Sequence, residues 1–465
     1  MSSSSAAPKF RVAICGAGIG GLALAIAIEK FAQHDVQINV YESRDDITTA
    51  GAGISIALRA TEIMRELGMY EEIFGVSTKF PSSDLVPSGP LVRKSDISEG
   101  GFKWFQRITK QEGLLMTRQD LVDILKQHLP ASCTVHFNKH LTTYNKQPAG
   151  SIALHFADDS AATTDVLIGA DGIRSSVRKT FFETIDRGLV NSSKIAHYAN
   201  AYWTGSLIYR AMFPVEKLSK MDPNNVVSKG SVLFCGKGKV NCRNHWFYLP
   251  PNEVIIIPQH ITSYLVSQGT LINVVAYVSD KQKAGTPFEG HWVSDVSREE
   301  FEEAFQNFEP AVKNLLKCCE NPTRWALHVV NELPLSTCDR VALIGDACHA
   351  MTSHLGAGAG QAIEDAFVLG RLLAHPLTRL DNIHVALKIY QDVRLSVAQF
   401  IARESEDLGY MYEFNTPGYY DGTDRGNEGE EGSEGDGGAI AGWLKAERKL
   451  QESVTLYNAP LFSLL

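Results

Sequence analysis

A glycine-rich turn near the start of the chain has the residue types and spacing to bind a phosphate-containing cofactor. An apolar run at 11–15, typical of a strand, leads into a Gly-x-Gly-x-x-Gly pattern and an apolar helix over 22–31. Glycine permits the tight turn and lets backbone N–H groups approach a pyrophosphate at the helix N-terminus. A second apolar run, 36–41, ends in Glu42, whose carboxylate can accept both hydroxyls of an adenosine ribose. The pattern predicts dinucleotide binding by the three glycines, Gly16, Gly18 and Gly21.

Two later segments also run from an apolar stretch into glycine and aspartate. Residues 165–170 precede Asp171, and residues 341–344 precede Asp346. A glycine-rich turn, 356–360, then opens another expected helix. From residue types alone, Asp171 is equally suited to cap a helix, and the turn at Asp346 could be an ordinary connection between strand and helix.

The three motifs, in this order and spacing, resemble those of the group A flavoprotein monooxygenases, the family of para-hydroxybenzoate and salicylate hydroxylases. The resemblance covers nearly all of residues 9–400. It implies that the first motif holds the ADP part of FAD, that Asp171 lies near the pyrophosphate and that Asp346 binds the ribityl chain. It also implies that the glycine-rich turn lies beside the isoalloxazine ring. The residues assigned to FAD are Gly16, Gly18, Gly21, Glu42, Gly53, Arg118, Asp171, Asp346, Gly356 and Ala359.

Arg118 matches the family's arginine on the cofactor side, although an arginine at the start of a helix is also common. No second dinucleotide motif is visible in the sequence. As in this family, NADH or NADPH is therefore expected to bind transiently.

Arg210 and Tyr264 are the candidate catalytic residues. Arg210 interrupts an apolar strand at 208–213, and a buried arginine is rare without a partner. In fungal salicylate hydroxylase-like enzymes, a Tyr-Arg at this position faces the substrate, which implies that Arg210 binds an anion and that Tyr264 faces the cavity. The alternatives are an arginine paired with a structural acid and a core tyrosine. His349 is suited either to proton transfer or to packing against the cofactor turn.

Two segments depart from the family pattern. Ser353 stands where the family usually has a proline whose carbonyl helps to shape the active site, so this departure bears on hydroxylation rather than on FAD binding. Residues 240–259 have no counterpart in the family. Valine codons begin with GT and one glutamine codon is CAG, the borders of a spliceosomal intron, so we hypothesise a retained intron or a gene-model error. A genuine surface insertion in a hairpin is the alternative.

The composition is that of a soluble enzyme. The 465 residues are enough for two or three domains, and a net charge of −9 disfavours binding to nucleic acid or to anionic membranes. The apolar run 19–28 is too short to span a bilayer, and residues 1–8 lack the basic region of a signal peptide. The eight cysteines show no metal-binding spacing, which favours reduced thiols, no metal site and a cytoplasmic location. No preference for an oligomeric state is evident.

The expected fold class is α/β, with a Rossmann-like FAD-binding domain around a parallel sheet, a mostly antiparallel substrate-domain sheet and a C-terminal helical segment. Strands are expected at 206–213, 231–235 and 270–278, and helices at 299–316 and 383–408. An acidic, glycine-rich segment, 422–438, is expected to be a disordered loop, followed by an amphipathic segment at 439–451. The predicted parts are 9–185 and 299–375 for FAD, 186–298 for substrate and 376–465 for the C-terminal helical region.

These features together predict a fungal-type, FAD-dependent aromatic-ring monooxygenase that uses NAD(P)H and O2. The resemblance implies that reduced flavin forms a C4a-hydroperoxide, which attacks a phenol or an aromatic carboxylate, such as an intermediate of secondary metabolism. Such a species survives only where water is excluded. A flavin-dependent epoxidase or oxidase of the same fold and a non-catalytic carrier protein remain alternatives.

Overall fold

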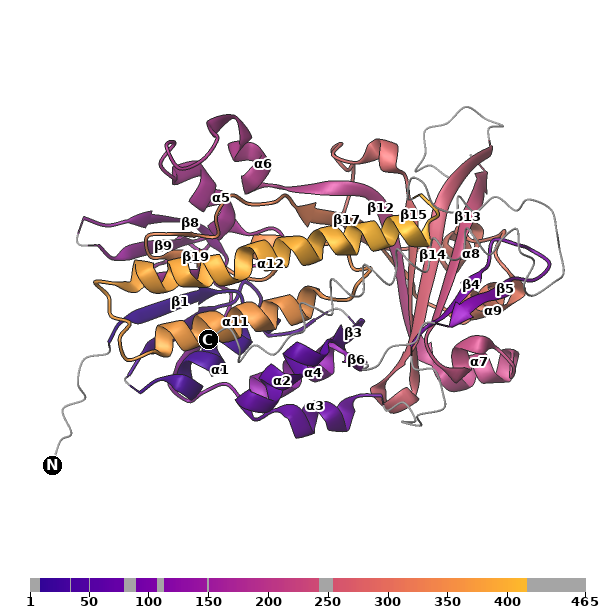
Figure 1. The fold of residues 1–465 in the computed structure, drawn as a ribbon, viewed down its shortest axis with the longest axis horizontal. Helices are drawn as coiled ribbons and strands as arrows, with labels where there is room; N and C mark the ends of the chain where they lie inside the picture. Colours follow the sequence, from indigo (N-terminus) through magenta and orange to yellow (C-terminus); the bar gives the residue numbers. More distant parts are fainter. Residues whose placement is uncertain are drawn as a thin grey trace.

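The computed structural model describes residues 9–33, 35–49, 51–78, 89–106, 113–148, 150–241 and 254–415. Two large sheets dominate this part of the chain, one in each half of the molecule (Figure 1). The predicted disordered segment 422–438 and the amphipathic segment 439–451 lie outside the described residues.

The first sheet is mostly parallel and lies in the half that contains the first glycine-rich turn (Figure 1). β1 pairs in parallel with both β2 and β11, and β11 pairs in parallel with β19. Only the edge strand β18 is antiparallel within it. Its strands, in spatial order, are β18 (Thr337–Cys338), β19 (Val341–Leu343), β11 (Val166–Gly169), β1 (Arg11–Cys15), β2 (Gln37–Tyr41) and β7 (Cys133–His136).

Both faces of this sheet are covered, as expected of parallel strands with apolar side chains on each side. Val12 and Ile14 of β1 join the core under one group of helices, whereas Ala13 and Cys15 join the core on the other face. The helices of the first face are α1 (Ile19–Phe31), α2 (Leu58–Leu67), α3 (Tyr70–Val76), α4 (Arg118–Gln127), α11 (Gly358–Ala374) and α12 (Ile383–Tyr412). The second face carries α5 (Ser176–Thr184), α6 (Ile195–Ala199) and a three-stranded sheet of β8 (Leu141–Lys146), β9 (Ile152–Phe156) and β10 (Ala161–Thr164).

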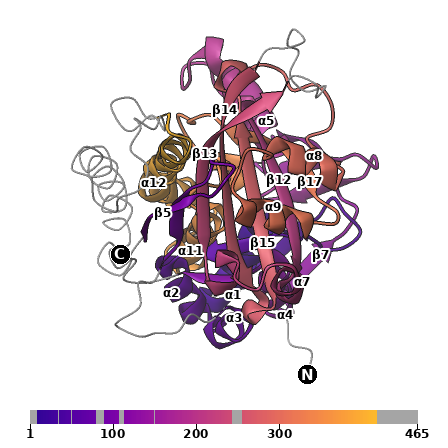
Figure 2. The same cartoon turned by 90° about the vertical axis from the view of Figure 1, so that its right-hand side faces the viewer.

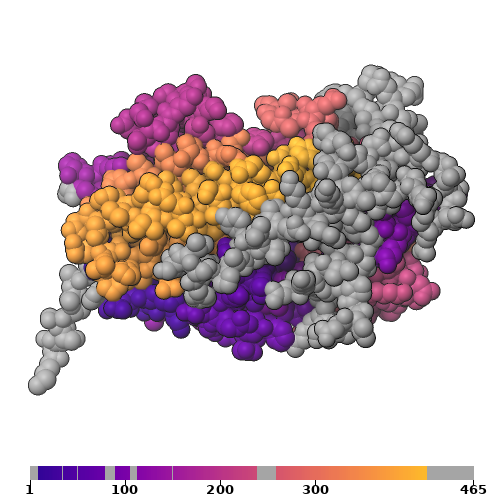
Figure 3. Space-filling view, in the orientation of Figure 1, coloured from indigo at the N-terminus to yellow at the C-terminus, as the bar shows by residue number. Residues whose placement is uncertain are grey.

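Helices α1 and α11 lie side by side, and glycine makes this close approach possible. A Cβ atom on Gly370 of α11 would lie 2.6 Å from Cβ of Ala27 in α1. A Cβ on Gly20 would contact Ala362 at 3.4 Å. The long helix α12 runs alongside α11 and forms a large part of the surface seen in Figure 3.

The second sheet is mostly antiparallel and forms the other half of the molecule. Only the pair β4 and β13 is parallel in it. Its strands, in spatial order, are β16 (Val293–Asp295), β17 (Thr323–Val330), β12 (Ala201–Pro214), β15 (Leu271–Ser279), β14 (Val254–Val266), β13 (Val232–Asn241), β4 (Leu91–Lys94) and β5 (Phe102–Gln106). A short two-stranded sheet, β3 (Gly53–Ile56) and β6 (Leu114–Thr117), completes the described strands.

The two faces of the second sheet differ because side chains alternate along each strand. On the outer face, Tyr209 and Phe213 of β12 join an apolar core with α7 (Val215–Met221), α8 (Arg298–Ala304) and α9 (Pro310–Lys317). Figure 2 shows these helices in front of the sheet. On the inner face, Arg210 shares a row with Val275 and Thr262, two residues along from the row of Met212, Asn273 and Tyr264. The inner face therefore carries four polar side chains beside the apolar Met212 and Val275, and it faces the half that contains the first sheet (Figure 1).

The architecture confirms the predicted fold class. The strands predicted at 206–213 and 270–278 are present as β12 and β15, and the helix predicted at 383–408 is present as α12. The helical segment predicted at 299–316 is two helices instead of one. Pro310 occupies the first turn of α9, where its missing N–H costs nothing, and α8 ends at Ala304.

No helix in the described part of the chain is long and apolar enough to cross a membrane. Within the same residues, no group of histidine, cysteine and acidic side chains has the geometry of a metal site. The described cysteines, including the adjacent Cys318 and Cys319, are free thiols.

Candidate cofactor and substrate site

The glycines of the first motif have different roles. Gly16 has φ +104°, and a Cβ there would lie 2.3 Å from the carbonyl oxygen of Ala170. A Cβ on Gly21 would lie 2.0 Å from the carbonyl oxygen of Gly16. Gly18, by contrast, has no atom within 4 Å of such a Cβ and is the N-cap of α1. Gly16 and Gly21 thus allow the turn to close on itself, while Gly18 leaves the helix N-terminus open to a pyrophosphate.

Glu42, just after β2, is held against the same turn. One carboxylate oxygen accepts a hydrogen bond from the Ala17 N–H at 2.9 Å, and the other accepts one from the Arg44 N–H at 3.0 Å. Glu42 therefore orders the turn itself, and its contact with an adenosine ribose remains a prediction.

Asp171 supports the N-terminus of α5, whose N-cap is Ser175. One of its carboxylate oxygens accepts the Val177 N–H at 3.0 Å, and the other accepts the Ser175 hydroxyl. Burial raises the pKa of Asp171, and these hydrogen bonds oppose that shift. The backbone of Asp171 also adjoins Gly16, so Asp171 connects α5 to the first motif. A role of Asp171 near the pyrophosphate remains a prediction.

Asp346 and Arg118 begin two different helices and lie close enough for their charges to interact. Asp346 begins the short helix α10 (Asp346–His349) and is exposed between two buried neighbours, Gly345 and Ala347. Arg118 begins α4 behind a capping box and is also exposed. Desolvation nevertheless lowers the pKa of Arg118, while nearby Asp346 raises it and nearby Arg210 lowers it. The three charged side chains therefore lie close enough to interact electrostatically.

The glycine-rich turn at 356–360 lies beside β3 and runs into the start of α11. Gly356 has φ +62°, which favours glycine, and a Cβ there would contact Ser55 of β3 at 3.6 Å. Two residues later α11 begins, and Gly358 has open space where a side chain would be. Ala359 packs partly against the core below. The N-terminus of this 17-residue helix carries partial positive charge that can stabilise an anion.

Arg210 and Tyr264 lie on the inner face of the second sheet, in adjacent rows. The Nε atom of Arg210 is buried without a hydrogen-bond partner, and its guanidinium lies 5.1 Å from the ring centre of Trp325. Among the described residues, Arg210 forms no ion pair, so a structural acid does not account for it there. Burial raises the pKa of the Tyr264 hydroxyl, and Arg210 lowers it. The two predicted catalytic residues are thus close enough for the charge of Arg210 to influence the Tyr264 hydroxyl.

Gly53 lies at the boundary between the two halves. Its N–H donates a hydrogen bond of 2.9 Å to the side-chain oxygen of Asn273. A Cβ on Gly53 would lie 2.9 Å from Cε2 of Tyr264. The structure therefore places Gly53 against Asn273 and Tyr264 of the second sheet, and its contact with FAD remains a prediction.

Comparisons with known proteins identify the family. Residues 316–405 match the family described as "FAD binding domain". The chain is 32% identical over 412 residues to a salicylate hydroxylase of Pseudomonas putida, a match that spans 88% of this chain and 87% of the relative. It is 29% identical to a 6-methylsalicylate 1-monooxygenase of Aspergillus terreus, over 89% of this chain and 85% of that one. A solved structure of a salicylate hydroxylase substrate complex superposes with a TM-score of 0.69 at 30% identity, covering 88% of this chain and 90% of that one.

The chain belongs to the FAD-dependent aromatic monooxygenase family. Its cofactor is FAD, and the local geometry fits that group, because Gly18 leaves a helix N-terminus open and the exposed side chains of Arg118 and Asp346 lie near each other.

A buried polar cluster in this monooxygenase was not predicted from the sequence. The ring of His260 stacks on Tyr277 with centroids 4.2 Å apart, and both rings lie near His354. Nδ1 of His260 lies 3.3 Å from a carboxylate oxygen of Glu413, within ion-pair distance but without the alignment of a hydrogen bond. The alternation of side chains between the two faces of β14 and β15 was the available sequence signal that His260 and Tyr277 lie on one face. Glu413, which follows α12, offered none.

Ser353 belongs to this cluster. Its hydroxyl and that of Tyr277 are 2.8 Å apart and share a hydrogen bond. A proline at this position could not make that contact. The serine that departs from the family pattern therefore has a polar partner, Tyr277, on the second sheet. His349, in turn, is buried and lies 2.5 Å from Asp365, so that it joins α10 to α11.

The hypothesised insertion begins inside a hairpin. Residues 240–241 and 254–259 continue β13 and β14, with Val240 opposite Ile255, and residues 242–253 lie outside the described residues. Cys235 and His260 are also opposite each other. Removal of 240–259 would keep that pair and leave Gly236 to Lys239 as the turn. The intron remains a hypothesis beside a genuine extension of the hairpin.

Proposed function

We propose that the protein hydroxylates a small phenol or aromatic carboxylate, with NADH or NADPH as the electron donor and O2 as the oxidant. Arg210 supports this proposal most strongly. It places a cation on the inner face of the second sheet, and no acid within the described residues pairs with it. Arg210 is half-buried and its buried Nε atom lacks a hydrogen-bond partner, so an anion bound there would satisfy this group.

The residues divide the work between cofactor and substrate. FAD, when bound, carries electrons from the nicotinamide to O2, and the residues around it hold and shield the reactants. Arg210 binds the carboxylate or phenolate of the substrate. Tyr264 stays protonated, because burial raises its pKa, and so donates a hydrogen bond to the same ligand. The N-terminus of α11 stabilises negative charge on the flavin ring.

The printed names of the relatives guide the choice of substrates. The names salicylate hydroxylase and 6-methylsalicylate 1-monooxygenase both refer to hydroxybenzoates. A hydroxybenzoate combines a carboxylate for Arg210 with an electron-rich ring, so this class is the one to test first. The nicotinamide binds transiently.

Anaerobic reduction of the flavin by NADH and by NADPH tests the proposal. Reduction is followed by flavin absorbance with salicylate, 6-methylsalicylate, an uncharged phenol or no addition. A hydroxybenzoate should speed reduction severalfold in the unchanged protein. Arg210→Gln should raise the KM for the hydroxybenzoate by about tenfold or more, because a hydrogen bond to a charged group contributes about 1.5–3 kcal/mol. It should have little effect on the uncharged phenol.

Arg324→Gln is the matched control. Arg324 is a buried arginine on the neighbouring strand β17, where it lies opposite Tyr209 of the outer face and forms an ion pair with Glu300 at 2.6 Å. If both variants change KM equally, Arg210 has no specific role in binding the anion. A bound flavin that no phenol affects would favour the oxidase or epoxidase alternative.

A further inference from the structure

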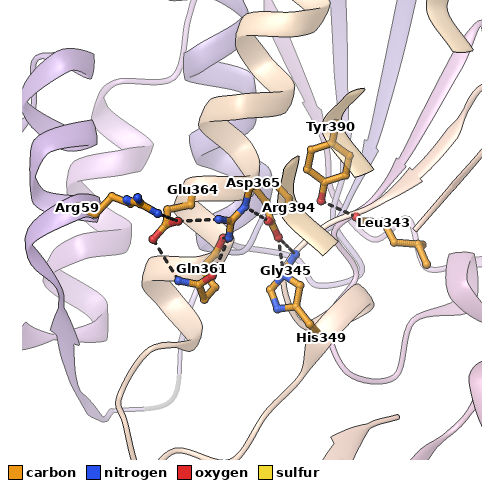
Figure 4. Close-up of polar contacts among 9 residues, drawn as sticks. All are labelled: Arg59, Leu343, Gly345, His349, Gln361, Glu364, Asp365, Tyr390 and Arg394. Carbon is orange, nitrogen blue, oxygen red and sulfur yellow. Dashed lines mark hydrogen bonds and ion pairs between the residues drawn. The ribbon is translucent and has the colours of Figure 1, made fainter. Parts of the chain in front are cut away.

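A buried carboxylate lies directly behind the turn that presents Asp346. Asp365 of α11 is fully buried, and one of its oxygens accepts the Gly345 N–H at 2.9 Å. The same oxygen lies 2.5 Å from Nε2 of His349 (Figure 4). Gly345 precedes α10 and His349 is its last residue. One oxygen atom therefore ties together both ends of the short helix that begins with Asp346.

The turn needs this support because its geometry is unusual. Gly345 has φ +56° and ψ −141°, and a Cβ there would lie 3.2 Å from Cβ of Ala362 in α11. The Gly345 carbonyl accepts hydrogen bonds from the N–H groups of both Cys348 and His349, so the residues of the turn form one hydrogen-bonded unit. Asp346 is the exposed member of this unit. Its direction follows from how the unit is fixed to α11.

Helix α12 completes the support. Arg394 is buried, and its Nε donates to the second oxygen of Asp365 at 2.9 Å. Tyr390, one turn earlier, donates from its hydroxyl to the carbonyl of Leu343 at 2.9 Å, at the end of the strand that enters the turn. Burial alone would raise the pKa of Asp365, but His349 and Arg394 outweigh it and hold the pKa below its usual value. The carboxylate is therefore charged at neutral pH.

The adjacent Glu364 provides an internal comparison. It is also buried, and it accepts a hydrogen bond from Nη1 of the same Arg394 at 2.6 Å. Its other partners are Arg59 of α2, at 3.4 Å, and Gln361. Within the described residues, Glu364 has no hydrogen bond or ion pair to the turn at 345–349. Two neighbouring carboxylates thus share one arginine, but only one of them contacts the turn.

We propose that Asp365 is a positioning residue for FAD: with Arg394, it holds the turn at 345–349 so that Asp346 faces the cofactor. The proposal rests on the predicted contact of Asp346 with the ribityl chain and does not depend on the substrate. It distinguishes Asp365 from Glu364, which contributes stability only.

The test compares Asp365→Asn with Glu364→Gln. Apoprotein is titrated with FAD by fluorescence, and its thermal unfolding is measured in parallel. Asp365→Asn should raise the Kd for FAD by about tenfold or more, as expected from the loss of a charge-assisted hydrogen bond. Glu364→Gln should lower the unfolding temperature of the apoprotein and leave the Kd for FAD within about twofold.

Displacement by ADP separates positioning from general damage. ADP reaches the first motif but carries no ribityl chain, so Asp365→Asn should leave its affinity unchanged. Weaker binding of ADP and FAD by the same factor, or an equal effect of both variants on FAD, would overturn the proposal. If Asp365→Asn does not fold, Asp365→Glu replaces it, because it keeps the charge near Arg394 but shifts the oxygen that holds the turn. An unchanged Kd for FAD in that variant would also overturn the proposal.

Discussion

At the scale of single residues, the predicted substrate site depends on a glycine, Gly53, as well as on charged side chains. Gly53 leaves room for Tyr264 and Asn273, and its N–H fixes the Asn273 side chain. A Cβ at this position would lie 2.8 Å from Cγ of Asn273, so at least one of the two side chains must move. Both lie in the row next to Arg210 on the inner face of the sheet.

Gly53→Ala should therefore raise the KM for the aromatic substrate severalfold and destabilise the fold by about 1–3 kcal/mol, the usual cost of overpacking. Steady-state kinetics and urea unfolding measure the two effects. Gly51→Ala is the control, since its Cβ would only touch Met212 at 3.7 Å. An unchanged KM in Gly53→Ala would show that the substrate does not depend on the position of Tyr264 and Asn273.

Local motifs and long-range contacts differ in how well they could be predicted. Gly16, Glu42 and Asp346 follow apolar runs within a few residues, so the sequence pattern was sufficient to single them out. Asp365 acts on Gly345 from 20 residues away, across two helices. Glu413 meets His260 from the far end of α12. No local pattern indicates such contacts, because they exist only once the helices have packed.

At the scale of elements, the contact between α1 and α11 is a narrow fit. It joins the helix of the first motif to the helix of the third, with Gly370 directly against Ala27. A Cβ atom added to Gly370 would overlap Cβ of Ala27 at 2.6 Å, and closely packed helix backbones can move apart only a little to relieve such an overlap. The sequence predicted both helices but not this pairing, and it missed the break before Pro310 within the segment predicted as helical.

Gly370→Ala should lower the free energy of unfolding by about 1–3 kcal/mol through this clash, although alanine is the better helix former. Urea unfolding of the apoprotein is the measurement. Gly75→Ala is the matched control in α3, where a Cβ meets nothing within 4 Å, and it should be neutral or slightly stabilising. Equal stability of the two variants would mean that α1 and α11 separate easily.

At the scale of the whole molecule, the cluster around His354 connects its two halves. His354 comes from the loop before α11, lies against Gly409 of α12, and contacts His260 and Tyr277 of the second sheet. Burial, then His260 and Lys281, lower the pKa of His354 well below its usual value. The folded protein therefore keeps this ring neutral under conditions in which the unfolded chain binds a proton.

The sign of the resulting pH dependence follows. Below the unfolded pKa of about 6.5, the unfolded state takes up one more proton, and stability falls by up to about 1.4 kcal/mol per pH unit. His354→Gln should remove the contribution of this histidine to the pH dependence. The free energy of unfolding should then fall by about 1 kcal/mol less between pH 7.5 and pH 5.5 than in the unchanged protein. Urea midpoints at the two pH values measure it. His384→Gln, a substitution of an exposed residue on α12, is the control and should not change the fall in stability between the two pH values. If His354→Gln also leaves this fall unchanged, His354 is not one of its causes.

The strand order of the first sheet also bears on how the protein is made. β1, β11 and β19 are neighbours in space, yet β19 is synthesised long after β1. A chain emerging from the ribosome carries the first glycine turn early but lacks Asp346, α11 and the supporting α12 until most of it has been translated. FAD can therefore be captured only late in synthesis or after release. Cells short of flavin would therefore contain full-length protein that lacks the cofactor.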